Sequence, residues 1–131
     1  MRQYANDYQE GHVTIDIIED DSSYQTDQVI TSLDRSSTTI RRSGKAFENR
    51  VPLAEAKIPL SDAGSARDLQ KSLINENLRI YDPIDNSCVS HVCDILEAGG
   101  HPEINRHPIS YAKFYKKHGF IRDKSKPMLP R

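Results

Sequence analysis

The sequence predicts one small domain in which strands come first and helices follow. At 131 residues the chain is long enough to bury a single modest core and short for two domains. Alternating apolar residues near the N-terminus predict a strand, and two later segments carry apolar residues at helical spacing. The chain is 36% hydrophobic and 28% charged, which is typical of a globular, rather loop-rich domain.

The strands are expected in the first half of the chain. Residues 12–18, HVTIDII, alternate between an apolar face with Val13, Ile15 and Ile17 and a polar face with His12, Thr14 and Asp16. A second strand over 24–33 would complete a hairpin. Residues 34–50 are polar and basic without clear periodicity, and predict a long loop or an irregular edge. Residues 51–60 carry two prolines, which suits an edge strand or an extended crossing segment.

Three helices are expected in the second half. Ser61 or Asp62 can cap a helix that runs to about Asn75. Asn86 or Ser87 can cap a second helix, which ends where two glycines at 99–100 permit a left-handed cap. Residues 108–117 predict a last helix, and the chain from about 120 reads as a loose basic tail.

Charge is divided unevenly along the chain, although the net charge is only −1. Residues 1–34 hold eight acidic residues and one basic residue, and residues 106–131 hold eight basic residues and one acidic residue. The two ends could attract one another in the fold or simply be solvated. A basic tail interleaved with aromatic residues could also bind RNA. The candidates for nucleic-acid binding are Lys113, Lys116, Lys117 and Arg122.

Both cysteines lie on the second helix, where their surroundings should differ. Val89, Val92, Cys93 and Leu96 form one apolar stripe, so Cys93 is expected in the core and His91 on the polar flank. Cys88 falls at the start of the helix, where unpaired N–H groups and the helix dipole favour the thiolate form of a nucleophile. The alternative is that Cys88 is only a small apolar helix residue.

A metal site and a disulfide are not expected from these residues. Cys88, His91, Cys93 and His101 are possible zinc ligands, but their spacing scatters them around the helix, so one tetrahedral centre could not collect them. Two cysteines five positions apart on a helix point in different directions and do not bridge easily. No cofactor is implied by any motif.

A nucleophilic cysteine needs a base, and His12 is the most suggestive histidine. It begins a strand whose other face is apolar, and a strand packed against a helix N-terminus can hold an imidazole near a thiol. His91 lies on the same helix as Cys88 and would leave little room for a substrate. The alternative for His12 is a solvent-facing strand residue.

Two segments, GHVTIDI at 11–17 and NSCVSHVCDILEAGG at 86–100, occur in an order that resembles the circularly permuted papain-like cysteine hydrolases. This group is related to the NlpC/P60 and lecithin:retinol acyltransferase-like enzymes. The second segment is also similar to C-terminal toxin domains of bacterial polymorphic and contact-dependent growth inhibition systems. The two segments cover a minor part of the chain.

The resemblance implies an α+β fold in which the Cys88 helix packs against a small antiparallel sheet bearing His12. Cys88 would be the nucleophile and His12 the base, and the N-terminal turn with Asn86 and Ser87 would supply the cap and the oxyanion hole. Asp16 is the first candidate to orient the imidazole. Gln25 and Asp27 on the next strand are equal alternatives.

The function implied is that of an antibacterial toxin domain acting as a cysteine peptidase or amidase. Such a domain would be exported as part of a larger protein, act in the cytoplasm of the target bacterium and be neutralised by a cognate immunity protein. Cleavage of tRNA on the same scaffold is the first alternative, because a fold does not fix a chemistry. A non-catalytic partner-binding module is the second. Neither a membrane span nor a signal peptide is expected in this segment.

Overall fold

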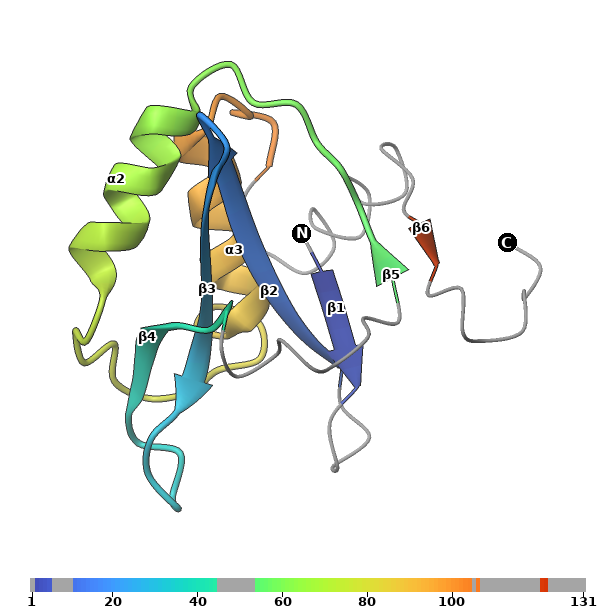
Figure 1. Ribbon diagram of the computed structural model, residues 1–131. Helices are drawn as coiled ribbons and strands as arrows, with labels where there is room; N and C mark the ends of the chain where they lie inside the picture. The colour runs from blue at the N-terminus through green and yellow to red at the C-terminus, as the bar shows by residue number, and fades with distance from the viewer. Residues whose placement is uncertain (1, 6–10, 45–53, 105, 107–120, 123–131) are drawn as a thin grey trace.

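The computed structural model describes residues 2–5, 11–44, 54–104, 106 and 121–122, and has an α+β fold. Its strands form an antiparallel sheet in the order β4-β3-β2-β1-β5-β6, with two helices packed against it (Figure 1). The elements are β1 Arg2–Ala5, β2 Gly11–Glu19, β3 Ser22–Ile30, β4 Thr38–Arg42, β5 Ala54–Glu55, α2 Ala63–Leu73, α3 Cys88–Ala98 and β6 Ile121–Arg122.

The long hairpin of β2 and β3 is the centre of the sheet. Its tight turn places Asp20 and Asp21 at positive φ, 50° and 62°, a conformation that aspartate adopts more readily than most residues. The strand predicted from the alternation of residues 12–18 is confirmed. The second strand begins earlier than predicted and ends at Ile30. Part of the predicted loop, Thr38–Arg42, is the edge strand β4.

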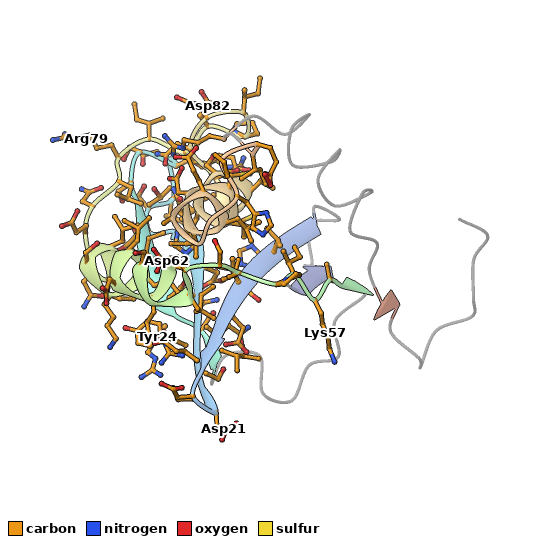
Figure 2. The ribbon with its side chains drawn as sticks, turned by 90° about the horizontal axis from the view of Figure 1, so that it is seen from above. Asp21, Tyr24, Lys57, Asp62, Arg79 and Asp82 are labelled. Carbon is orange, nitrogen blue, oxygen red and sulfur yellow. The ribbon has the colours of Figure 1, made fainter. Side chains whose placement is uncertain are left out.

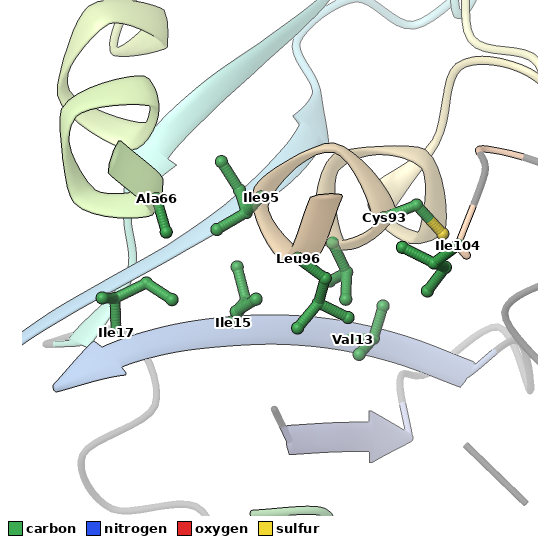
Figure 3. Packing of buried hydrophobic residues seen from close by; sticks show 9 residues of the cluster. Val13, Ile15, Ile17, Ala66, Cys93, Ile95, Leu96 and Ile104 are labelled. Atoms are coloured by element: carbon green, nitrogen blue, oxygen red, sulfur yellow. The ribbon is translucent and has the colours of Figure 1, made fainter. Parts of the chain in front are cut away.

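The hydrophobic core lies between β2 and the two helices. Figure 3 shows that the side chains of Val13, Ile15 and Ile17 project from β2 toward α2 and α3, as their alternation predicts. Ala66 of α2 packs against this cluster from the helix layer. The buried cluster consists of Val13, Ile15, Ile17, Ala66, Val92, Cys93, Ile95, Leu96 and Ile104.

The two helices begin and end at residues whose chemistry explains their limits. Asp62 caps α2, since its carboxylate accepts from the Ser65 backbone N–H at 3.0 Å. The helix α3 ends at Ala98, and Gly100 then takes a positive φ of 112° that a glycine adopts at low cost. The predicted glycine stop is therefore confirmed.

Between β5 and α2 the chain crosses the molecule in an extended segment, as the prolines in 51–60 predict. Figure 2 shows Lys57 on this segment, with its side chain directed away from the helices. Ile121–Arg122 pairs with β5. The predicted helix at 108–117 and the rest of the predicted tail lie outside the described residues. Among the residues that are described, no helix is long and apolar enough to cross a membrane.

Candidate functional site

His12 and Asp27 form the centre of the candidate site. The His12 Nε2–H donates to Asp27 Oδ2 at 2.6 Å. The Asp27 side chain is fully buried, and the His12 side chain keeps 18% of its surface exposed. The strand β2 supplies the histidine and β3 the carboxylate, so the β2–β3 hairpin fixes their separation. The imidazole is therefore held by a rigid part of the sheet with one edge open to solvent.

A second cation, Arg41, contacts the same carboxylate from β4. Its Nε–H donates to Asp27 Oδ1 at 2.9 Å and its Nη2–H donates to Oδ2 at 3.2 Å. Burial raises the pKa of Asp27, but the hydrogen bonds from His12 and Arg41 outweigh burial and hold that pKa below its ordinary value. Asp27 is therefore an anion shared by two cations.

Cys88, the first residue of α3, lies close enough to His12 to act on its pKa. Burial lowers the pKa of His12, but the hydrogen bond to Asp27, the hydrogen bond to the Cys88 sulfur and the charges of both groups raise it to about 9. His12 and Cys88, which lie 76 positions apart in the sequence, are therefore near one another in the fold.

The N-terminal turn of α3 is built by a reciprocal capping box. The Ser87 Oγ accepts from the Val89 N–H at 3.2 Å, and the Ser90 Oγ accepts from the Ser87 N–H at 3.0 Å. Ser87 is therefore the cap, one of the two residues predicted for it. Cys88 is the first residue of the helix, as expected.

Asn86, the other predicted cap, has a different role. Its side-chain amide donates to the carbonyls of Leu78 and Ile80, at 2.7 and 2.8 Å. Its Oδ1 accepts from Gln28 Nε2 at 2.8 Å, which ties this turn to β3. Asn86 thus fixes the loop that leads into Cys88, and of the two caps predicted the helix uses Ser87.

Asp16 was the first candidate to orient the imidazole, and the geometry gives that place to Asp27. Asp16 accepts from the Ser23 hydroxyl at 2.5 Å in an exposed part of the hairpin, with Gln25 opposite it in the ladder. Gln25 donates to Thr14 Oγ1 at 2.9 Å. Of the three acceptors considered from the sequence, Asp27 is the one bonded to His12.

His91 is buried, so the prediction of a polar flank is wrong. The residue is only 2% exposed, and its Nε2 lies 2.7 Å from Thr26 Oγ1 of β3. Burial lowers the pKa of His91 to about 4, against the weaker opposite effect of the Asp27 charge. Because α3 contacts β2, β3 and α2, more than one stripe of the helix is covered. A neutral, buried histidine anchors the helix here.

Cys93 and His101 are the other two residues considered as metal ligands. Cys93 is 1% exposed, as expected of a core residue, and burial raises the pKa of its thiol to about 12. His101 follows the opposite end of the helix and bonds Glu103 and the Pro59 carbonyl. Within the described part of the chain, no group of three or more His, Cys, Asp or Glu side chains could hold a metal ion.

The basic residues considered for nucleic-acid binding stand near the C-terminal end of the sequence. Lys113, Lys116 and Lys117 lie outside the described residues, and Arg122 is described only as a member of β6.

Comparison with known proteins adds no family to this geometry. No family model matches the chain, and no curated protein or solved structure matches it. The functional argument therefore depends on the site itself.

Proposed function

We propose that the protein is a cysteine hydrolase in which Cys88 is the nucleophile, His12 carries the proton and Asp27 orients the imidazole. The observation that carries this proposal is that the His12 imidazole is hydrogen-bonded to the Asp27 carboxylate and lies close enough to Cys88 for that side chain to raise its pKa. A nucleophile, a base beside it and a third group that orients the base make up the catalytic set of cysteine and serine hydrolases.

The protonation state of His12 supports this role. With a pKa of about 9, the imidazole is protonated at neutral pH. A cation beside a sulfur favours the thiolate, which is the nucleophilic form of cysteine. A protonated His12 beside Cys88 therefore supplies both that cation and the proton that the leaving group takes up.

The proposed reaction is hydrolysis of an amide or related acyl bond. The thiolate attacks the carbonyl carbon, a C–S bond forms and the π electrons move to the oxygen. The Cys88 N–H is a donor suited to that oxyanion, because first-turn N–H groups have no partner inside the helix. His12 gives its proton to the leaving amine as the C–N bond breaks. It then accepts a proton from water, which hydrolyses the thioester and releases the acid and the thiolate.

The permuted papain-like architecture and the toxin setting belong to the same proposal. A strand with the histidine precedes a helix with the cysteine, and α3 packs on β2. The setting is supported by the resemblance of residues 11–17 and 86–100 to toxin domains. In that setting the domain is exported within a larger protein, acts in the cytoplasm of a target bacterium and is neutralised by an immunity protein.

Inducible expression in bacteria tests the proposal, with cell growth, protein cleavage and tRNA integrity followed together. Cys88→Ser and His12→Ala should abolish growth inhibition, because each removes a reacting group. Cys93→Ala is the matched control, since it removes the other cysteine from the core without touching His12, and it should remain inhibitory. A folded Cys88→Ser protein that still inhibits growth would overturn the assignment. Cleavage of tRNA that survives alkylation of Cys88 would favour a ribonuclease.

A further inference from the structure

We propose that Arg41 is a positioning residue that acts on His12 through Asp27, by holding that buried carboxylate ionised and correctly oriented. The inference depends on the proposed Cys88–His12 chemistry and adds the residue that sustains it. Asp27 and Arg41 are direct partners in the β3–β4 ladder, so their contact is a cross-strand pair on rigid strands.

Asp27 needs a permanent cation because its side chain is fully buried. A buried carboxylate without a partner is costly, and it responds by taking up a proton. His12 cannot be the permanent partner, since a histidine that moves a proton in each turnover changes charge. Arginine stays protonated at every working pH. Arg41 keeps 41% of its side-chain surface exposed, so its own charge remains partly solvated.

The geometry of the contact also fixes the direction of the carboxylate. Nε of Arg41 faces Oδ1 at 2.9 Å, and Nη2 faces Oδ2 at 3.2 Å. A guanidinium that contacts both oxygens sets the plane of the carboxylate, which a single-point donor does not do. Oδ2 is the oxygen that accepts from His12. The two-point contact with Arg41 therefore fixes the direction of the Oδ2 lone pair that accepts from His12. It thereby fixes the orientation of the imidazole beside Cys88.

Removing Arg41 should change the pKa of Asp27, because burial and hydrogen bonds act on that pKa in opposite directions. Burial raises the pKa of this carboxyl, and the hydrogen bonds from His12 and Arg41 lower it. Without Arg41 only His12 opposes burial, so the pKa of Asp27 rises and the carboxylate is lost at a higher pH. Once Asp27 is neutral, it stabilises the imidazolium less, and a neutral imidazole no longer supplies a cation beside Cys88.

The test measures the rate at which iodoacetamide alkylates Cys88 in the full chain, from about pH 4.5 to 9, with mass spectrometry separating Cys88 from Cys93. Arg41→Met should move the acidic limb of the rate profile up by about one pH unit and slow alkylation about tenfold on that limb. Arg41→Lys should keep part of the rate that Arg41→Met loses, because lysine retains the positive charge but cannot contact both carboxylate oxygens as the guanidinium does.

Arg42→Met is the matched control. Arg42 is the next residue of β4, lies 4.1 Å from the Tyr24 ring centroid and donates to the Ser23 carbonyl. Its removal should leave the Cys88 profile unchanged. If Arg41→Met and Arg42→Met give the same profile, Arg41 has no positioning role.

A double-mutant cycle separates positioning from general stabilisation. In an Asp27→Asn background, Arg41→Met should have no further effect on the alkylation rate, because the group through which it acts is gone. An additive loss would overturn the inference, and so would an unchanged profile for Arg41→Met in a protein whose Cys88 still reacts rapidly. If Cys88 of the unmodified protein reacts no faster than an ordinary thiol, the proposed function itself fails.

Discussion

His91 Nε2 and Thr26 Oγ1 lie 2.7 Å apart, and this buried bond ties the helix that carries Cys88 to the strand that carries Asp27. Gln70 of α2 donates to the same Thr26 hydroxyl at 2.9 Å. Because the Thr26 oxygen accepts from Gln70, its O–H can donate to a neutral His91. The two helices and β3 thus meet at one hydroxyl, one residue before Asp27.

Replacement of His91 should destabilise the fold. His91→Ala removes a buried hydrogen bond and leaves a cavity, and it should lower the free energy of unfolding by about 2–4 kcal/mol. Urea unfolding followed by circular dichroism measures the change. Glu97→Ala is the control on the same helix, since Glu97 is exposed, and it should change stability by less than about 0.5 kcal/mol. Equal stability of the two variants would contradict the anchoring role.

His91 should also make the stability of the fold sensitive to acid. The folded-state pKa of His91, about 4, lies below the ordinary value of 6.5, so the unfolded chain takes up the proton first. The contribution of His91 to the free energy of unfolding is complete above about pH 6.5 and is lost as the pH falls toward 4. The loss amounts to about 3 kcal/mol. His91→Gln removes this titration. The stability difference between the unmodified protein and His91→Gln should therefore shrink with acidification, and a constant difference would argue against the shift.

His12 should make the stability of the fold sensitive to alkali. Its folded-state pKa, about 9, lies above the ordinary value, so its contribution is complete below about pH 6.5 and is lost as the pH rises through 9. The loss should reach up to about 3 kcal/mol. Urea unfolding at a series of pH values should show a decline for the unmodified protein and little decline for His12→Ala. Parallel curves for the two proteins over this window would refute the shift.

Gly100 should resist substitution. It has a positive φ of 112°, and an added Cβ would collide with the Ser61 side chain. Gly100→Ala should cost more than about 1 kcal/mol, because both the backbone and the contact are strained. Gly44 is the control, since a Cβ there would meet nothing within 4 Å. Similar melting temperatures for Gly100→Ala and Gly44→Ala would show that the turn relaxes easily.

Periodicity in the sequence predicted the strand of His12, both helices and the core position of Cys93. These features depend on local spacing, which is visible in one sequence. Chain order and the helix start also pointed to Cys88 and His12 as partners. The edge strand β4 was missed because its residues are polar and alternate weakly, and its pairing with β3 decides its structure.

The rest of the site depends on contacts between distant residues. Asp27 could not be chosen over Asp16 from the sequence, because the bend and register of the hairpin decide which carboxylate reaches His12. Arg41 fell in a segment predicted as a loop or irregular edge. His91 was misplaced because a single apolar stripe does not reveal that α3 is covered from several sides.

The pH dependence of Cys88 alkylation tests the central claim most directly. Iodoacetamide should modify Cys88 well below pH 7 and leave Cys93 untouched, since Cys93 is only 1% exposed and burial raises the pKa of its thiol to about 12. In His12→Ala the reaction of Cys88 below pH 7 should slow at least about tenfold and follow the profile of an ordinary thiol. Rapid, unchanged alkylation of Cys88 in a folded His12→Ala protein would contradict the Cys88–His12 pair.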